Sequence, residues 1–505
     1  MDNTNTLSIS SPRTSSDNSF LAMRNMLTIF ALMVFLGFPG NFSKIIGGSA
    51  VKMIEYLSFA IQFILVMMAS GDEVKSVKLV SLYPAYWIMY LYVFYLIADS
   101  LMVVSNKKTV IITLVHLLLT VMFSLWLVEQ FDLEEMLELV YSAQLVIVGI
   151  CLICMVILPK VVFYTYQGAK TFCGLYANKN GCATELSFGI LVQLILLLLR
   201  VRNKKKISIV FIAMIPLQFG MLLLCKAAGA VFITIACVGY SLFYSVQKKK
   251  QKLPLGFIFI VVTIGFLIFA LTVLQILEPF LNSIGKDASL TGRVPIWNQV
   301  IKVMQESHTM TGYGYEMFWK TDSSLRAFRS GFSKYSWAYN SCSNSHNTIM
   351  ELWCNTGLIG VVLYYFMFFS ADRGIKHLND EQYIFCSCFM VLFTVRALTE
   401  RQTDPATVYV MMSFVALAMM YQAHYSFMQS KLKTARIYKN DQQTLADVTR
   451  EDVPEWFAFQ SKFSNVSDTK KPSSNQNSQF APLWDDEPHE KSFEQKMREL
   501  EEEDW

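Results

Sequence analysis

The feature that most constrains this chain is a series of long apolar stretches, each near the ~20 residues that a helix needs to cross a bilayer. Hydropathy gives about twelve of them. They fall near residues 26–40, 51–69, 83–104, 109–128, 138–158, 184–200, 207–225, 227–246, 254–276, 348–370, 382–397 and 405–422. With 53% hydrophobic and 16% charged residues, the chain of 505 residues is too apolar for a soluble protein. The sequence therefore predicts an all-α polytopic membrane protein with about 12 transmembrane helices.

The N-terminal segment MDNTNTLSISSPRTSSDNSF is polar and lacks the basic segment, short apolar segment and cleavage site of a secretory signal. We therefore expect the first apolar stretch to remain as an anchor. The net charge is only +4, and the basic residues cluster in short loops instead of forming a stripe. This pattern indicates membrane orientation and argues against a nucleic-acid partner.

Two basic clusters, RVRNKKK at Arg200–Lys206 and QKKKQK at Gln247–Lys252, predict the orientation of the chain in an inner (cytoplasmic) membrane. Both are expected on the cytoplasmic side, together with the N- and C-termini, which leaves the loops 159–183 and 277–347 outside. Lys107 and Lys108 then fall outside against the rule, and the acidic segment after residue 131 falls inside. Acidic residues count for little in this rule, so the orientation stands.

These boundaries divide the chain into five regions. They are a polar cytoplasmic N-terminus (1–25), transmembrane helices 1 to 9 (26–276), a large extracytoplasmic catalytic loop (277–347), transmembrane helices 10 to 12 (348–425) and a cytoplasmic, largely disordered tail (426–505). Within the loop, RVPIWNQVIKVMQES has the apolar spacing of a helix. A long polar loop between apolar spans is the expected functional region, because such a loop is seldom kept without a task.

Polar residues predicted at the outer ends of different spans form the candidate site. They are Lys179, Asn180, Lys226, Arg293, His346, Asn347, Glu351, Arg396, Glu400 and Arg401. Cations at this depth are costly unless an anion compensates them, and a lipid phosphate is a suitable anion. Two simpler interpretations remain open: Lys226 can extend to the membrane surface, and Arg293 can form a structural ion pair.

Arg293 and His346 together fit a group transfer without a metal or cofactor. An arginine can stabilise charge on a leaving pyrophosphate, and a histidine at a loop-to-helix junction can remove a proton from an attacking hydroxyl. The loop acids have no spacing typical of a glycosidase pair. The chain also has no P-loop and no GxSxG elbow, so nucleotide hydrolysis and serine-hydrolase chemistry are not supported.

The motifs LTGRVPIWNQVI, TGYGYEMFW and SHNTIMELWCNTGLIGVVLYYF, in this order, resemble the O-antigen ligase and Wzy-type polymerase superfamily of membrane glycosyltransferases. The closer likeness is to exopolysaccharide repeat-unit polymerases. The upstream FCGLYANKNGCA is similar to a family loop that carries Lys-Asn in polymerases. Cys225-Lys226 stands where many members have Ser-Arg, which keeps the positive charge and loses the bidentate fork.

This resemblance implies a GT-C-like helical bundle in which one large external loop caps a cavity open to the outer leaflet. It implies transfer of glycan from undecaprenyl-pyrophosphate to an acceptor sugar hydroxyl. Arg293 and Lys226 would hold the pyrophosphate, and His346 would act as base or orient the acceptor. The pocket would be shaped by Asn180, Lys179, Asn347, Glu351 and Glu400. The expected partners are the lipid-linked glycan, membrane lipids, and flippase and chain-length regulator proteins.

Three functions remain open at this point. A polymerase of lipid-linked repeat units is favoured over a ligase that transfers glycan to lipid A core or protein. A transporter or flippase is disfavoured, because transporters place charges near mid-membrane and show two related halves. Cys173 and Cys182 flank a short loop on the expected outer side, where an oxidising environment would allow them to pair.

Overall fold

The computed structural model describes residues 15–38, 40, 43–68, 84–166, 168–176, 178–246, 251–283, 289–290 and 292–451. The expectations for residues 1–14, for the lysines of 247–250 and for most of the C-terminal tail lie outside the described residues. The chain separates into two compact units, Met1–Leu432 and Lys433–Trp505. The fold and the candidate site described below belong to the first unit.

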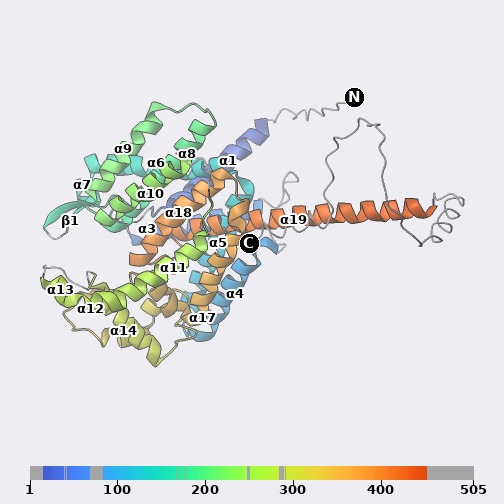
Figure 1. Cartoon of the computed structure of the whole chain (residues 1–505). Helices are drawn as coiled ribbons and strands as arrows, with labels where there is room; N and C mark the ends of the chain where they lie inside the picture. The colour runs from blue at the N-terminus through green and yellow to red at the C-terminus, as the bar shows by residue number, and fades with distance from the viewer. Residues whose placement is uncertain are drawn as a thin grey trace, which may run out of the picture. The chain divides into compact units, whose positions relative to one another are not determined.

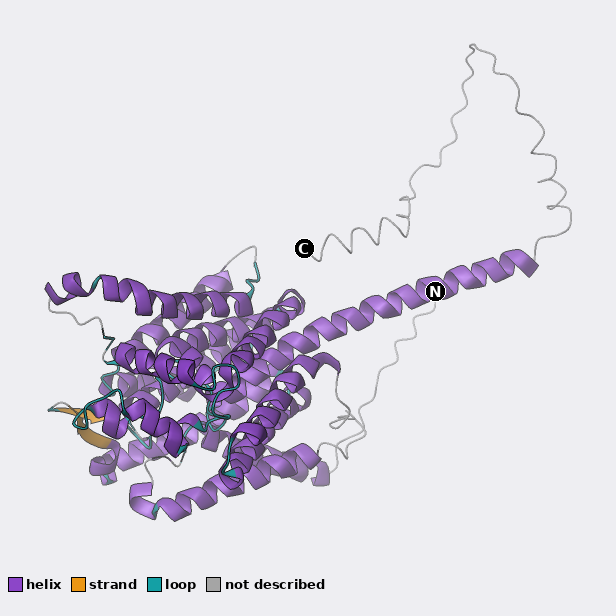
Figure 2. Cartoon of the chain, turned by 90° about the horizontal axis from the view of Figure 1, so that it is seen from below, coloured by secondary structure: helices purple, strands orange, loops and turns teal. Residues whose placement is uncertain are grey.

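Helices dominate the described residues, and each of the predicted apolar stretches overlaps one (Figures 1 and 2). These helices are α1 (Ser15–Phe35), α3 (Gly48–Met68), α4 (Trp87–Val103), α5 (Lys107–Gln130), α6 (Leu133–Ile157), α8 (Lys179–Arg202), α9 (Ile209–Leu224), α10 (Ala228–Val246), α11 (Leu255–Ile268), α17 (Thr348–Ala371), α18 (Asp380–Thr399) and α19 (Val408–Glu451). A π-helical turn η5 (Phe269–Val273) and α12 (Leu274–Ile276) extend α11.

Seven helical segments of the described chain are long and apolar enough to cross a membrane. They are Gly48–Met68, Lys107–Gln130, Leu133–Ile157, Lys179–Arg202, Leu255–Ile276, Thr348–His377 and Asp380–Thr399. Four shorter apolar helices, of 10–17 residues, accompany them: Ser19–Phe35, Trp87–Val103, Ile209–Leu224 and Ala228–Tyr244. The protein is therefore an all-α, multi-pass membrane protein.

Local sequence explains where several of these helices begin. Asp132, Asn178, Ser208 and Asn347 each accept a hydrogen bond from a backbone amide of the first turn, at the starts of α6, α8, α9 and α17. Asn379 forms a complete capping box with Gln382 at the start of α18. A polar cap satisfies backbone amides that have no partner within the helix, which fixes the first residue of each helix.

One departure from the predicted all-α fold is a short antiparallel hairpin in the segment 159–183. Strand β1 (Phe163–Tyr166) pairs with β2 (Ala169–Phe172), with Phe163 opposite Phe172. Gly168 in the connecting turn has a φ of 77°, which glycine adopts without strain. Aromatic and β-branched residues in FYTY and AKTF favour strands, but the segment is too short for a clear periodic signal.

The short elements include α2 (Ser43–Ile46), η4 (Pro84–Tyr86), α7 (Pro159–Val162) and η7 (Asp372–His377). The segment 277–347 contains α13 (Glu278–Ser283), α14 (Arg293–Glu306), η6 (Phe318–Lys320), α15 (Asp322–Arg329) and α16 (Trp337–Ser341). The helix predicted in RVPIWNQVIKVMQES is therefore confirmed as α14. Its buried Trp297 packs in a second hydrophobic core with Phe318 and Phe328, so this segment has a core of its own.

The basic cluster Arg200–Lys206 lies against acidic residues of other helices. Arg200 is 2.9 Å from Glu138, Lys205 is 2.8 Å from Glu134, and Arg202 is 3.7 Å from Asp380. Glu134, one of the acidic residues that opposed the orientation rule in the sequence, thus forms an ion pair with the basic cluster. This arrangement brings the C-terminal end of α8 to the N-terminal ends of α6 and α18.

Candidate functional site

The candidate site centres on Glu400, the residue that ends α18. One carboxylate oxygen, Oε1, is 3.3 Å from Nη2 of Arg293, and the other, Oε2, is 3.2 Å from Nδ1 of His346. The three side chains are each about a quarter exposed, at 25%, 24% and 23% for Arg293, His346 and Glu400. The structure thus brings together two residues predicted to be catalytic and a third predicted to shape the pocket.

His346 is held in an uncommon backbone conformation by its neighbours. Its φ of 52° lies in the left-handed region, which residues other than glycine rarely adopt. The preceding Ser345 is fixed on both sides: its amide donates to Glu351 at 2.8 Å, and its carbonyl accepts from Trp297 at 2.8 Å. Strain of this kind persists where surrounding contacts determine the backbone, often at functional sites.

The start of α17 is joined to the turn that carries Glu400. The Asn347 side chain caps α17 and also donates to the carbonyl of Leu398 at 3.0 Å. The Thr348 hydroxyl donates to the carbonyl of Glu400 at 3.0 Å and accepts from the amide of Gln402 at 3.1 Å. These bonds fix the distance between the two backbones, and hence between the His346 and Glu400 side chains.

The hydrogen bond to Glu400 also determines what the His346 ring can do. An ionised carboxylate only accepts, so Nδ1 of a neutral imidazole must carry the hydrogen and Nε2 keeps a lone pair. Burial raises the pKa of Glu400, but its hydrogen bond to His346 and the positive charges of Arg396 and Arg293 lower it below its usual value. Glu400 is therefore ionised at neutral pH, and Nε2 of His346 can act as a base.

A second polar network lies directly beyond Glu400. Arg401 is 2.8 Å from Glu316 and 2.7 Å from Asp404, and it is 3.9 Å from Glu351. Three carboxylates around one guanidinium cannot all be ionised cheaply when buried. Burial and the nearby charges of Asp404 and Glu351 raise the pKa of Glu316 to about 7, although Arg401 opposes the shift.

Glu351 connects this network to His346. Its side chain is completely buried and accepts from the Trp319 indole at 2.9 and 3.1 Å and from the Ser345 amide at 2.8 Å. Asn355 donates a further bond to it at 3.3 Å. Through its bond to the Ser345 amide, Glu351 thus holds the loop that carries His346.

The remaining predicted site residues lie near the first turn of α8 and at the turn between α9 and α10. Lys179 and Asn180 open α8, directly after its cap Asn178. Lys226 is exposed at the α9–α10 turn with a φ of 52°. Lys226 does not contact the Arg293, His346 and Glu400 side chains directly. Near this turn, the Ser187 hydroxyl of α8 donates to the carbonyl of Ala230 of α10 at 3.4 Å, which joins α8 to α10.

Cys173 and Cys182, the two cysteines considered for pairing, are buried and are not bonded to each other. The Sγ atom of Cys173 lies 3.3 Å from the carbonyl oxygen of Val162. Within the part of the chain that the structure describes, no three His, Cys, Asp or Glu side chains are grouped as a metal site would require.

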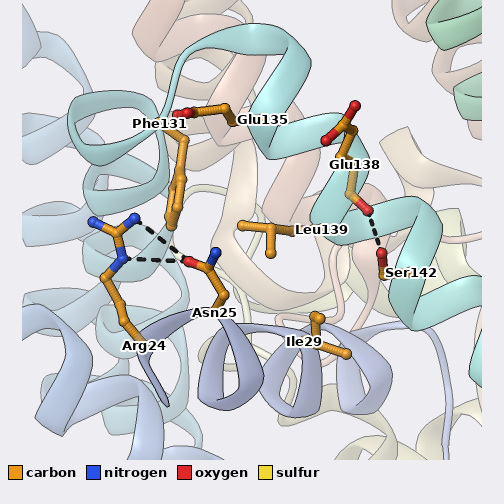
Figure 3. A pocket seen from close by; sticks show the side chains of 8 residues that line it. All are labelled: Arg24, Asn25, Ile29, Phe131, Glu135, Glu138, Leu139 and Ser142. Atoms are coloured by element: carbon orange, nitrogen blue, oxygen red, sulfur yellow. Dashed lines mark hydrogen bonds between the residues drawn. The ribbon is translucent and has the colours of Figure 1, made fainter. Parts of the chain in front are cut away.

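Hollows of about 310, 360 and 440 Å³ lie at the other end of the bundle. Figure 3 shows one of about 360 Å³, which Arg24 and Asn25 of α1 line together with Phe131 and Glu138. Glu138 is the ion-pair partner of Arg200, whereas Arg396, one turn before Glu400, contacts Thr184 near the start of α8. Thr184 and Arg200, both on α8, are therefore about 24 Å apart at ~1.5 Å per residue. This hollow is therefore separate from the candidate site.

Sequence reasoning identified the residue types at the site but not their partners. Glu400 was expected to shape a pocket, and its contacts with Arg293 and His346 join residues 107 and 54 positions away. The hydrogen bonds of Trp297 to Ser345 and of Trp319 to Glu351 were not predicted from the sequence. The sequence signal that could have indicated these bonds is an indole in the same loop as buried polar groups, because a buried indole nitrogen needs an acceptor.

Comparison with known proteins agrees with these features. Residues 217–365 match the family model described as O-antigen ligase, a range that includes Lys226, Arg293 and His346. The chain is also 28% identical, over 259 residues, to the exopolysaccharide production protein ExoQ of Rhizobium meliloti (strain 1021). That alignment covers 48% of this chain and 56% of ExoQ, so the chain spans little more than half of this curated relative.

The fold and the site define a multi-pass membrane protein with a polar cluster of arginine, histidine and glutamate where a helical segment meets the bundle. The two matches support the O-antigen ligase and Wzy-type superfamily, so the superfamily resemblance predicted from the sequence motifs is confirmed.

Proposed function

We propose that this protein is a membrane glycosyltransferase that polymerises lipid-linked oligosaccharide repeat units of an exopolysaccharide, capsule or O-antigen. The glycan is transferred from undecaprenyl-pyrophosphate to an acceptor sugar hydroxyl. The single observation that carries the proposal is the pairing of Arg293 and His346 on the two oxygens of Glu400. In this proposal, Arg293 is the cation for the leaving phosphate and His346 is the base for the attacking hydroxyl.

The reaction follows from these groups. Nε2 of His346 removes the proton of the acceptor hydroxyl as its oxygen bonds to the anomeric carbon of the donor. The bond between that carbon and the pyrophosphate oxygen breaks, and Arg293 stabilises the charge on the leaving pyrophosphate. Glu400 stabilises the imidazolium through Nδ1, and the proton then passes to solvent or to the released pyrophosphate.

The remaining predicted residues supply binding and position in this proposal. Lys226, Lys179 and Asn180 approach the lipid diphosphate from the α8 and α9–α10 side, and Asn347 and Glu351 position His346. The bundle contains about 12 transmembrane helices in an inner membrane. The segment 277–347 faces the extracytoplasmic side, with both termini cytoplasmic. A flippase and a chain-length regulator are the expected protein partners.

The proposal is tested with Arg293→Ala and His346→Ala in a strain that lacks the chromosomal gene. Each variant is expected to abolish long-chain glycan while membrane insertion and protein amount stay unchanged. Arg326→Ala and His308→Ala serve as controls, because both side chains are exposed on the same loop segment and neither forms the ion pairs of Glu400. Long-chain glycan at the wild-type level in either site variant would contradict the catalytic assignment.

A ligase remains the second candidate, because the matching family model is described as O-antigen ligase. The same chemistry would then transfer a finished glycan to lipid A core or to a protein. Deletion of the gene distinguishes the two. A polymerase mutant leaves single repeat units at the surface, whereas a ligase mutant leaves finished polymer on its lipid carrier. Loss of lipid-linked glycan from the outer leaflet would instead indicate a transporter.

A further inference from the structure

Arg396 is a charged residue near the site to which the function proposed above gives no role. It lies on the last turn of α18, one turn before Glu400. Its Nη1 donates to the Thr184 hydroxyl of α8, and its guanidinium stacks over the Tyr409 ring at 5.1 Å from the centroid. Tyr409 itself donates to the carbonyl of Thr184 at 2.9 Å. One edge and one face of the guanidinium are thus fixed against α8 and α19.

The other edge of this guanidinium, formed by Nε and Nη2, has no hydrogen-bond partner among the described residues. Nε is buried and has no hydrogen-bond acceptor, and Nη2 bonds to no other residue that the structure describes. Nε and Nη2 lie side by side, so they present the two parallel N–H groups that bind a phosphate or carboxylate in a bidentate manner. A buried donor without an acceptor costs roughly 1–3 kcal/mol, which a ligand that accepts from it would recover.

Neighbouring carboxylates do not fill this edge. Glu400 is close enough to be affected by the charge of Arg396, but its two oxygens already contact Arg293 and His346. Glu185 on α8 also interacts with the charge of Arg396, and its Oε2 has no hydrogen-bond partner. Among the described carboxylates, none lies within the 4.0 Å of an ion pair with Arg396.

Arg401, an arginine with a structural role, differs from Arg396 in its partners. Its guanidinium faces Glu316, Asp404 and Glu351 within 4.0 Å, so its charge is fully compensated. Arg396 has a hydroxyl and an aromatic ring in place of carboxylates. An arginine held rigidly, with one fork unpaired and no carboxylate within 4.0 Å among the described residues, is suited to bind an anion.

We propose that Arg396 is a second anion-binding arginine of this site, which holds one phosphate group of a diphosphate while Arg293 holds the other. This inference rests on the function proposed above and adds a determinant of substrate specificity. Both arginines act around Glu400, Arg293 from α14 and Arg396 from α18. A monophosphate can occupy only one of the two forks, so Arg396 selects for the diphosphate.

The test measures dissociation constants for undecaprenyl diphosphate and undecaprenyl monophosphate, with the full chain in lipid nanodiscs. The wild type is expected to bind the diphosphate more tightly. Arg396→Gln is expected to weaken diphosphate binding at least about tenfold and to leave monophosphate binding within about threefold. Arg396→Lys keeps the charge and loses the fork, and is expected to lose selectivity for the diphosphate as well.

Thr184→Val is the matched control, because it removes the hydroxyl that accepts from Nη1 and leaves the unpaired Nε–Nη2 fork unchanged. It is expected to keep the wild-type ratio of the two dissociation constants. If Arg396 only joins α18 to α8, Thr184→Val will lower the ratio as much as Arg396→Gln, and the inference is wrong. Thermal unfolding of each variant verifies folding, and Arg396→Lys decides if Arg396→Gln does not fold.

The outcomes separate this inference from the proposed function. A wild type that binds the diphosphate, together with an Arg396→Gln variant of unchanged selectivity, overturns only the role of Arg396. A wild type that binds neither lipid overturns both, because no diphosphate would then be recognised. Loss of selectivity in Arg396→Gln and Arg396→Lys, with normal selectivity in Thr184→Val, supports the assignment.

Discussion

Glu400 determines the chemistry of the candidate site at the scale of single residues. Its carboxylate orients the His346 ring through Nδ1 and compensates the charge of Arg293, at 3.2 and 3.3 Å. Both functions need the negative charge. An amide at this position could accept from only one partner through its oxygen, and its NH₂ group would face the other.

We therefore predict that Glu400→Gln lowers the rate of glycan transfer roughly 10²-fold or more, the range typical of a lost general base. The amide NH₂ favours a ring tautomer in which Nδ1 accepts and Nε2 carries the hydrogen. Glycan transfer by purified protein measures the effect. Glu306→Gln, the same change at an exposed position at the end of α14, is the control and should be neutral. Equal rates in the two variants would rule out the role of Glu400.

The raised pKa of Glu316 predicts that the stability of the protein depends on pH. Its pKa is raised to about 7 in the folded protein from an ordinary value of 4.5, so folding favours its neutral form. The stability that this preference contributes is present below pH 4.5 and is lost as the pH rises through about 7. The pKa of Glu400 is lowered, so its contribution changes only below pH 4.5, outside this range.

The wild-type protein should therefore have a lower thermal unfolding temperature at pH 8 than at pH 5.5 in detergent. Glu316→Gln mimics the neutral carboxyl and should show a smaller difference between the two pH values. Scanning fluorimetry of both proteins at the two pH values is sufficient. An unfolding temperature that rises equally with pH in both proteins would mean that Glu316 is ionised throughout.

Residue types at the loop ends were informative in the sequence, whereas contacts were not. Arg293 and His346 stood out because an arginine and a histidine flank a polar loop between apolar spans. The contact of Arg396 with Thr184 joins positions 212 residues apart, and no local pattern encodes such a pairing. The same holds for Arg401 and Glu316, separated by 85 residues.

At the scale of elements, hydropathy predicted the helices well because membrane helices are long and uniformly apolar. It did not predict how α17 is built. Gly357 has a φ of 63° and a ψ of −175°, so the helix is interrupted there. The amides of Leu358 and Ile359 bond instead to the carbonyls of Thr309 and Met310, at 3.0 and 3.3 Å. The loop thus completes the backbone bonds of a broken helix, as membrane proteins require.

We predict that Gly357→Ala destabilises the protein by roughly 2–4 kcal/mol, from the cost of a positive φ and from overlap of the new Cβ with the carbonyl of Met310. Gly265→Ala, inside α11, is the matched control because open space surrounds that position. It should be neutral or stabilising by up to ~1 kcal/mol. Denaturation in mixed micelles compares the two, and similar losses would show that the break in α17 is not needed.

At the scale of the whole molecule, the two ends of the bundle differ in charge pattern. The end near Lys205 carries the basic cluster and its acidic partners, as the rule for cytoplasmic loops would place it. The other end carries Arg293, His346 and Glu400. In the proposed orientation, this end and the proposed reaction face the extracytoplasmic side.

The orientation predicts that cysteines introduced at the two ends react from opposite sides of the membrane. Tyr335→Cys, at a position 97% exposed in the segment 277–347, should be labelled by an impermeant maleimide in intact spheroplasts. Lys204→Cys, exposed in the basic cluster, should be labelled only in inside-out vesicles. The ten native cysteines are buried, so the unmodified chain provides a low background. Labelling of both positions from one side would refute the orientation and, with it, an extracytoplasmic site, because the loop and the basic cluster would then share a face.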